Sequence, residues 1–266
     1  MEIWQAIVLG AVQGFAEFLP VSSSGHLILF QHLFGIREHA LFYSVTLHLG
    51  TLIPVIFVLR REIAELFKKP FDKLLYLTIA TIPAGALGLI LTKTTDLDAL
   101  FSERLILLAA AFAFTAAELL LAEKIAKSRK SQAATGCPLN FKTALSMGVG
   151  QAVGVFPGIS RSGTTAAFGV FAGTDRDVTA RFSFLMSVPV ILAAAFTQTL
   201  DCVKSGGISD VSALPIISGV LTAAITGYIA IEFMLKIIRK ADYKWFSLYL
   251  AVISAVTVIT AVAERV

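Results

Sequence analysis

The sequence is poor in charged residues and in cysteine. Only 15% of its 266 residues are charged, whereas soluble domains carry roughly 25%. Cys137 and Cys202 are too few for a disulfide framework, and their spacing fits no metal site. Apolar residues make up 56% of the chain, and the mean hydropathy is +0.81. One soluble core of this size could not bury so much apolar surface, which excludes a soluble enzyme, a disordered chain and a DNA-binding domain.

Long apolar runs make up most of the chain. Six of them have about the 20 residues needed to cross a hydrocarbon core roughly 30 Å thick. They cover residues 41–59, 74–92, 104–122, 179–200, 211–235 and 245–263. The sequence therefore predicts an all-α polytopic membrane protein, with residues 1–266 in a single membrane domain.

Two further apolar stretches are interrupted at their centres. Residues 3–34 are broken by Pro20–Gly25, and residues 141–173 are broken by Pro157–Gly163. The arm 3–18 would extend only about 24 Å as a helix, and the return arm from Leu27 is shorter still. Neither arm is long enough to span a bilayer, so we predict two re-entrant helical hairpins.

Positive charge is concentrated on one side of the predicted membrane. Of the 22 Lys and Arg residues, 16 fall in the intervals 60–73, 124–142, 176–181 and 236–244, and five fall on the opposite side. Because cytoplasmic loops are enriched in Lys and Arg, this asymmetry predicts that both termini are extracytoplasmic. The net charge of +4 then reflects membrane topology, and we expect no nucleic-acid partner.

The two interrupted stretches resemble each other. At an offset of 138 residues, Ala6–Leu27 and Ala144–Thr165 are identical at seven of 22 positions. Chance matching of small residues is the alternative, but three polar pairs match in register. These pairs are Gln13/Gln151, Ser22/Ser160 and Ser24/Ser162.

A repeat of this kind predicts two inverted halves. Each half, about 1–130 and 139–266, would hold one hairpin and three spans, and an odd number of spans reverses the orientation in the membrane. Many transporters follow this plan, with sites near the midplane built from broken helices. The two hairpin tips are therefore expected to meet inside the membrane.

The tips carry polar residues that are costly in a membrane. The first has Gln13, Glu17, Ser22, Ser23, Ser24 and His26, and the second has Ser160, Arg161, Ser162, Gly163 and Thr165. A charged group at the bilayer centre costs about 2.5–3.5 kcal/mol on insertion scales, and such groups commonly line a site. A Glu17–Arg161 ion pair that only ties the hairpins together is the structural alternative, but it would not need the accompanying hydroxyl groups.

These residue types suit phosphate chemistry. Arg161 offers a planar fork of donors for phosphate oxygens, and a helix that starts after the 158–163 turn would add its positive end. Glu17, with Gln13 one helical turn earlier, can hold a divalent cation. His26 can act as a general acid–base or a nucleophile, and Ser23 as a nucleophile if a base is near. The residues do not choose between Ser23, His26 and water as the attacking group.

The motifs resemble those of the bacterial undecaprenyl-diphosphatases of the bacitracin-resistance type, and the resemblance covers essentially the whole chain. The first motif reads Gln13-Gly-Phe-Ala-Glu17-Phe-Leu-Pro20-Val-Ser22-Ser23-Ser24-Gly25-His26, and the second reads Pro157-Gly-Ile-Ser160-Arg161-Ser162-Gly163-Thr164-Thr165. Many members have Glu at the position of Gln13, so Glu17 is expected to be the principal metal ligand here.

The resemblance implies hydrolysis of undecaprenyl diphosphate to undecaprenyl phosphate and phosphate, aided by Mg²⁺ or Ca²⁺. It also implies a bacterial cell-membrane location, a site facing the extracytoplasmic side, lipid contacts, and a homodimer as a candidate assembly. The implied catalytic residues are Glu17, Ser23, His26 and Arg161; the implied diphosphate-binding residues are Ser22, Ser24, Ser160, Arg161, Ser162, Gly163 and Thr165; the implied metal ligands are Glu17 and Gln13.

A transporter or flippase for polyprenyl phosphate is the alternative function, because inverted repeats are common in transporters. The tips, however, are unlike each other: Arg161 corresponds to Ser23, and Glu17 to Val155. Catalysis needs such an asymmetry of charge, whereas alternating access does not. His48 lies within a predicted span, where packing is the favoured interpretation.

Overall fold

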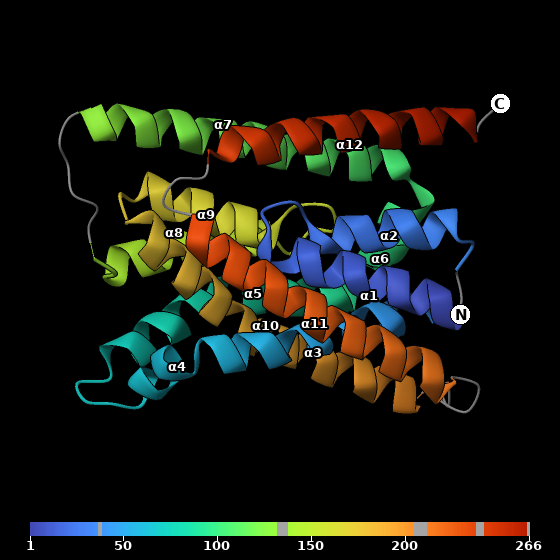
Figure 1. Cartoon of the computed structure of the whole chain (residues 1–266), viewed down its shortest axis with the longest axis horizontal. Coiled ribbons are helices and arrows are strands. Elements are labelled where there is room, and N and C mark those ends of the chain that lie inside the picture. Colours follow the sequence, from blue (N-terminus) through green and yellow to red (C-terminus); the bar gives the residue numbers. More distant parts are fainter. Residues whose placement is uncertain (37–38, 132–137, 205–211, 238–241, 265–266) are drawn as a thin grey trace.

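The computed structural model describes residues 1–36, 39–131, 138–204, 212–237 and 242–264, so Cys137 lies outside the described residues. Within these ranges it contains twelve helices and no strand (Figure 1). In chain order they are α1 (Ile3–Phe18), α2 (Ser23–Leu33), α3 (Ala40–Val58), α4 (Arg60–Leu66), α5 (Asp72–Thr94), α6 (Leu97–Glu103), α7 (Leu105–Ser131), α8 (Phe141–Val153), α9 (Arg161–Phe171), α10 (Arg176–Lys204), α11 (Ala213–Ile237) and α12 (Tyr243–Ala263).

The six predicted spans are confirmed as helices long and apolar enough to cross a membrane: α3, α5, α7, α10, α11 and α12. Large apolar side chains cover their outer surfaces, and Trp245 and Ile259 are each 68% exposed. Such a surface is incompatible with water but natural in lipid. The chain is therefore a multi-pass membrane protein.

Two features of the helices differ from the sequence-based expectation. The short helices α4 and α6 are not predicted by hydropathy, because each holds charged residues in the loops between spans. Helix α7 continues to Ser131, beyond the predicted end at residue 122. Its last turns are rich in charged residues, and a helix can extend past the apolar region because its backbone bonds are made internally.

The interrupted stretches form two helix pairs, α1–α2 and α8–α9. In Figure 1, α1 and α2 lie towards the end that holds both termini, α8 and α9 lie towards the opposite end, and the connecting turns approach each other midway. Adding 138 to the bounds of α2, 23–33, gives the bounds of α9, 161–171.

The expected start of the first return arm, at Leu27, is wrong by one helical turn. Helix α2 begins at Ser23 because Ser22 Oγ accepts a hydrogen bond from the Gly25 N–H at 3.3 Å. Helix α9 likewise begins inside its motif, where Ser160 Oγ caps the Gly163 N–H at 3.0 Å. The serines thus start helices by satisfying backbone donors that would otherwise be orphaned.

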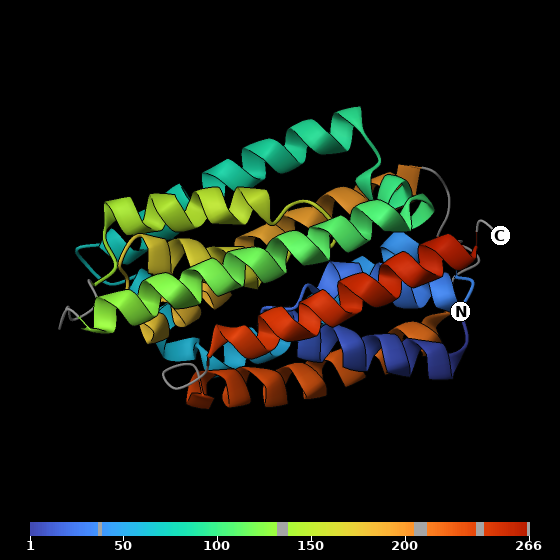
Figure 2. The ribbon, with the colours of Figure 1, turned by 90° about the horizontal axis from the view of Figure 1, so that it is seen from above.

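Each short helix pair packs against a long helix of the other half of the sequence. A Cβ on Gly10 of α1 would lie 2.3 Å from the Gly219 carbonyl oxygen of α11, and one on Gly148 of α8 would lie 2.8 Å from the Ala80 carbonyl oxygen of α5. Helices α7 and α12 also lie side by side (Figures 1 and 2). Small residues permit this close approach, which fixes both turns midway along the bundle.

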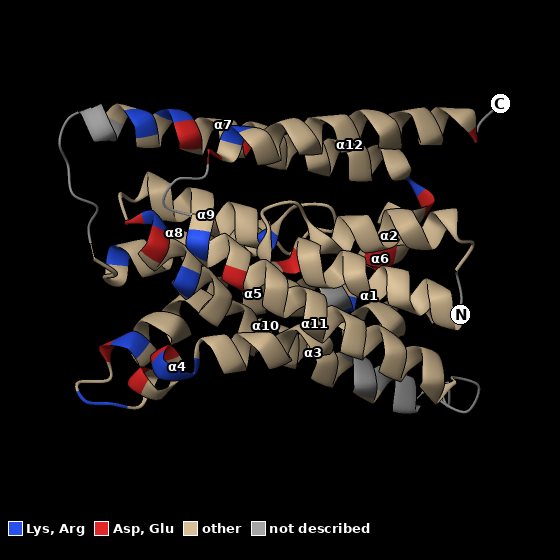
Figure 3. Cartoon of the chain, viewed as in Figure 1, with Lys and Arg blue, Asp and Glu red and all other residues tan. Residues whose placement is uncertain are grey.

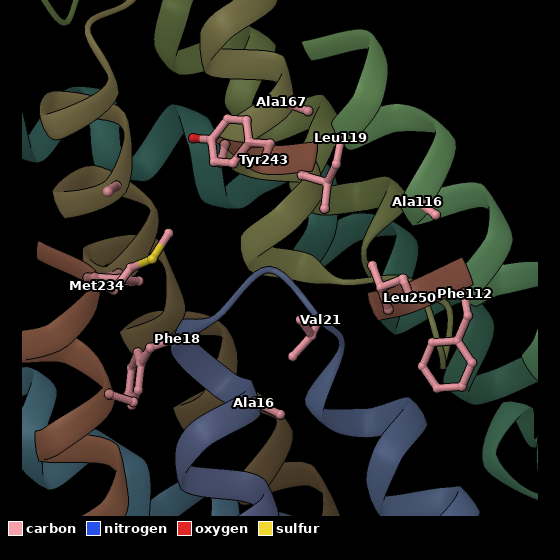
Figure 4. Packing of buried hydrophobic residues seen from close by; sticks show 14 of the residues in the cluster. Ala16, Phe18, Val21, Phe112, Ala116, Leu119, Ala167, Met234, Tyr243 and Leu250 are labelled. Atoms are coloured by element: carbon pink, nitrogen blue, oxygen red, sulfur yellow. The ribbon is translucent and has the colours of Figure 1, made fainter. Parts of the chain in front are cut away.

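An apolar cluster surrounds the turns. Phe18 and Val21 of the first turn belong to the same buried cluster as Phe112 of α7, Met234 of α11 and Leu250 of α12 (Figure 4). Polar side chains buried beside such a cluster need hydrogen-bond partners, either one another or a ligand.

Lys and Arg gather at the end of the bundle opposite the two termini (Figure 3). Ion pairs there join different helices: Arg181 of α10 lies 2.6 Å from Glu62 of α4, and Arg176 lies 2.6 Å from Glu123 of α7. Lys and Arg are thus segregated along the long axis of the bundle.

Candidate active site

Glu17 stands at the centre of the site, in the last turn of α1, and is only 4% exposed. Its Oε1 forms a salt bridge with Nη2 of Arg161 from the second tip. Its Oε2 accepts hydrogen bonds from Gln13 Nε2 at 3.0 Å and Ser23 Oγ at 2.6 Å. His48 Nε2 of α3 lies 3.5 Å from the same oxygen. One carboxylate therefore joins both tips and a long helix.

Ser23 is presented to Glu17 by an unusual turn. The preceding residue, Ser22, has φ +69°. Residues other than Gly rarely adopt this backbone conformation. The Ser22 carbonyl oxygen accepts from both the backbone N–H of His26 at 3.2 Å and its ring Nδ1 at 2.8 Å. These two bonds hold the strained residue in place.

His26 itself faces away from the carboxylate. Its Nδ1 is used by Ser22, and its Nε2 lies 2.8 Å from the hydroxyl oxygen of Tyr249 on α12. The edge of Phe112 covers the ring. Within the described contacts, the structure places His26 beside the first tip but gives it no bond to Glu17, Ser23 or Arg161.

Arg161 begins α9 and reaches across to the first tip. Besides Glu17, it contacts the Ser183 carbonyl oxygen of α10 at 3.5 Å through Nη1. The Ser183 hydroxyl lies 2.5 Å from Thr165 Oγ1. A guanidinium has more N–H donors than these contacts use, so Arg161 can bind Glu17 and a phosphate oxygen together.

The two tips also touch through their serines. Ser24 Oγ accepts from the Gly158 N–H at 3.4 Å, and Ser162 Oγ donates to the Leu19 carbonyl oxygen at 2.9 Å. A Cβ on Gly25 would lie only 2.8 Å from the Gly158 Cα. The predicted meeting of the tips is therefore confirmed.

Several predicted phosphate ligands serve the turns themselves. Ser22 and Ser160 cap α2 and α9, and a Cβ on Gly163 would lie 3.0 Å from the Ser160 side chain. Thr165 Oγ1 donates to the Arg161 carbonyl oxygen at 2.8 Å. Both helices thereby direct their N-termini towards the shared turns, where backbone dipoles favour an anion.

Known proteins resemble this chain along nearly its whole length. A family model described as Bacitracin resistance protein BacA matches residues 6–256. An undecaprenyl-diphosphatase of Carboxydothermus hydrogenoformans is 38% identical over 271 residues and covers 100% of both chains. Proteins of the same name from Methanobrevibacter smithii and Halothermothrix orenii are 37% and 36% identical, covering 94% and 98% of this chain and 94% and 99% of their own. The chain belongs to the BacA family.

The chain offers oxygen ligands for a divalent cation at the first tip. Gln13 Oε1 is buried and has no hydrogen-bond partner among the described residues. An amide oxygen beside the Glu17 carboxylate is a donor pair that suits Mg²⁺ or Ca²⁺. The described part of the chain holds no cluster of three His, Cys, Asp or Glu residues. The residues fit a cation whose other ligands are substrate phosphate or water.

Three residues around the tips are not predicted as site residues from the sequence: His48, Ser183 and Tyr249. Packing is the interpretation of His48 that the sequence favours, and the structure places its Nε2 3.5 Å from Oε2 of Glu17. The signal was the presence of a histidine inside an apolar span, where ionisable groups are costly. Ser183 and Tyr249 carry no such signal, since Ser and Tyr are ordinary residues in membrane helices.

Proposed function

We propose that this chain hydrolyses undecaprenyl diphosphate to undecaprenyl phosphate and inorganic phosphate. Membership of the BacA family and relatives named undecaprenyl-diphosphatase over the full chain length support this function. The transporter alternative is not favoured, because the full-length relatives are named undecaprenyl-diphosphatase and the charged groups of the two tips are different. In a bacterial cell membrane, this reaction would recycle the lipid carrier of cell-wall synthesis and confer bacitracin resistance.

One observation carries the proposal: Glu17 binds the hydroxyl of Ser23 and the guanidinium of Arg161 at the same time. The carboxylate of Glu17, which can act as a base, thus contacts both a hydroxyl nucleophile and a guanidinium that can bind phosphate. A structural tie between hairpins would need the ion pair but not the serine. The arrangement supports a site for phosphoryl transfer.

The contacts favour Ser23 as the attacking group. Its oxygen would attack the terminal phosphorus while Glu17 accepts the hydroxyl proton, and the bond to the bridging oxygen would break to release undecaprenyl phosphate. Water would then cleave the phosphoserine and free inorganic phosphate. Arg161 and the N-termini of α2 and α9 would stabilise the negative charge on the phosphoryl oxygens.

A bound Mg²⁺ or Ca²⁺ would neutralise part of the diphosphate charge at the first tip. Glu17 and Gln13 would hold it, with phosphate oxygens completing the ligand set. The unpaired amide oxygen of Gln13 supports this assignment.

The membrane arrangement is part of the proposal. The α1–α2 and α8–α9 pairs would be re-entrant hairpins in two inverted halves, with both termini and the site opening on the extracytoplasmic side. The equal offset between α2 and α9 and the reciprocal packing of α1 on α11 and α8 on α5 support the repeat. The gathering of Lys and Arg at the other end supports the orientation.

The test is phosphate release from undecaprenyl diphosphate by the purified protein in detergent, with Mg²⁺ or Ca²⁺ and then with EDTA. We expect cation-dependent release in the wild type, and a loss of at least about a thousandfold in Arg161→Ala and Glu17→Ala. Arg181→Ala, on α10 at the charged end, is the matched control and should retain activity. Normal turnover in both site variants would refute the assignment, whereas an inactive but folded wild type would refute the function.

A further inference from the structure

Both ring nitrogens of His26 are already hydrogen-bonded. Nδ1 lies 2.8 Å from the Ser22 carbonyl oxygen, and Nε2 lies 2.8 Å from the Tyr249 hydroxyl. His26 is only 4% exposed, and its ring is almost parallel to that of Tyr249, with an angle of 6° between the planes. The contact therefore joins α12 to the first tip across 223 residues of sequence.

The chemistry of these partners determines the tautomer. A carbonyl oxygen can only accept, so Nδ1 of His26 must carry a proton. In the neutral ring, Nε2 then holds the lone pair and accepts the proton of the Tyr249 hydroxyl. The opposite tautomer would direct two lone pairs at each other between Nδ1 and Ser22. Tyr249 thus stabilises the one tautomer that supports the tip.

The supported tip is the one that presents Ser23. Ser22 has φ +69°, and the Nδ1–H bond from His26 is one of two that hold its carbonyl group. The next residue, Ser23, donates to Glu17 at 2.6 Å. A change in the ring of His26 would therefore move the Ser22 carbonyl and, with it, the direction of the Ser23 hydroxyl.

We propose that Tyr249 is a positioning residue, whose hydroxyl fixes the Nδ1–H tautomer of His26 and so holds the Ser22 turn that aims Ser23 at Glu17. The inference rests on the proposed phosphatase function but concerns a residue outside both sequence motifs. It gives α12 a role in the site beyond its packing on α7.

The test uses Tyr249→Phe, which removes only the hydroxyl, and Tyr228→Phe as the matched control. Tyr228 of α11 is 42% exposed and Tyr249 is 43% exposed, so both variants alter a similar half-exposed tyrosine. The first measurement is the ¹⁵N NMR spectrum of the imidazole groups. The chain has only four histidines, and His26→Asn identifies the resonances of His26 by their loss.

We expect the wild-type spectrum to show His26 protonated at Nδ1, with Nε2 as a hydrogen-bonded acceptor. In Tyr249→Phe, the Nε2 resonance should shift towards the value of an acceptor without a donor. The second measurement is steady-state kinetics, in which kcat should fall about tenfold while KM changes less than twofold, because a residue that acts through the direction of the Ser23 hydroxyl affects the chemical step more than substrate binding. Tyr228→Phe should change neither measurement.

A double-mutant cycle separates this role from general destabilisation. The amide of Asn at position 26 can donate to the Ser22 carbonyl as Nδ1 does, but Asn has no Nε2 for Tyr249 to contact. Adding Tyr249→Phe to His26→Asn should therefore cause no further loss of kcat.

Three results would overturn the inference: an Nε2 resonance that Tyr249→Phe leaves in place, an unchanged kcat in that variant, or an additional tenfold loss in the double variant. In each case the wild type still releases phosphate, so the proposed function survives. A wild type that releases none removes the proposed function, and the inference falls with it.

Discussion

At the scale of single residues, the site depends on how one carboxylate is shared. Glu17 accepts from Gln13 and Ser23 and pairs with Arg161. Because the carboxylate is buried, losing any of these partners would leave charge or lone pairs uncompensated. The same burial makes the site sensitive to a change of charge at Gln13, which lies one helical turn away.

Gln13→Glu should make the thermal stability of the protein depend on a divalent cation. The change replaces an amide that donates to Glu17 at 3.0 Å by a second carboxylate, and two such groups repel unless a cation lies between them. We expect a lower melting temperature than wild type in EDTA, recovery in Ca²⁺ or Mg²⁺, retained activity, and a lower half-saturating cation concentration. Gln13→Ala, which loses the donor without adding charge, is the control. Cation titrations that superimpose on those of the wild type would contradict the proposed metal ligands.

Asp98 of α6 should make stability depend on pH. Burial, together with the nearby charge of Asp96, raises the pKa of Asp98 from 3.8 to about 6. The folded state therefore binds more protons than the unfolded state between pH 4 and 6, and stability falls as pH rises through that window. Asp98→Asn should flatten this part of the profile, which thermal unfolding from pH 4 to 7 would measure. An unaltered slope in the variant would exclude Asp98 as its source.

At the scale of helices, the site exists because two turns approach within contact distance. Gly25 and Gly158 lie against each other at this contact, and Gly158 has φ +83°, which favours glycine. The serine caps then begin α2 and α9 at the point of contact. Side-chain volume at the turns, rather than charge, limits how closely the tips approach.

Gly25→Ala should separate the tips. The added Cβ would lie 2.7 Å from the Phe112 ring and 2.8 Å from the Gly158 Cα, an overlap that costs typically about 1–3 kcal/mol. We expect a lower melting temperature and a loss of phosphate release of at least about tenfold, as small misplacements at reacting groups produce. Gly85→Ala in α5, where nothing lies within 4 Å of the Cβ, should be neutral or slightly stabilising. Equal behaviour of the two variants would show that the tips do not need close contact.

At the scale of the whole molecule, ion pairs join the long helices at the end of the bundle where Lys and Arg gather. Glu123 of α7 accepts from Arg176 of α10 at 2.6 Å and from the Tyr243 backbone N–H of α12 at 3.1 Å. Both charged groups are largely buried, and Arg176 also lies over the Tyr243 ring. This cluster joins three spans far from the tips, so it contributes to stability rather than to chemistry.

Glu123→Ala should reduce the free energy of unfolding by about 3 kcal/mol, because it removes the buried carboxylate that Arg176 and Tyr243 contact. Glu232→Ala on α11 is the control, since its pair with Lys236 is exposed at 3.8 Å and is worth about 0.5 kcal/mol or less. Denaturant unfolding in detergent measures both, and phosphate release at low temperature should be retained. A similar loss of unfolding free energy in the two variants would argue against a stabilising role of the Glu123 cluster.

Sequence alone determined the six spans and the composition of both tips. Hydropathy is a local property of the sequence, and it decides directly which segments are stable in lipid. A charged residue such as Glu17 or Arg161 inside an apolar stretch can be recognised without knowledge of its neighbours in space. The capping serines are visible in the motifs. Their effect on the start of α2 was missed, because the neighbouring proline and glycine residues indicate a turn rather than a helix. The predicted inversion and orientation remain to be tested.

Only the tertiary structure decided which helices surround the tips. His48, Ser183 and Tyr249 enter the site from three different spans. In lipid, apolar faces do not select partners by hydrophobicity, so neighbours are chosen by close packing at small residues such as Gly10 and Gly148. That selection depends on the shapes of surfaces far apart in the chain. The sequence therefore determined which reactive residues the tips carry, and the helix packing determined which other side chains support those residues.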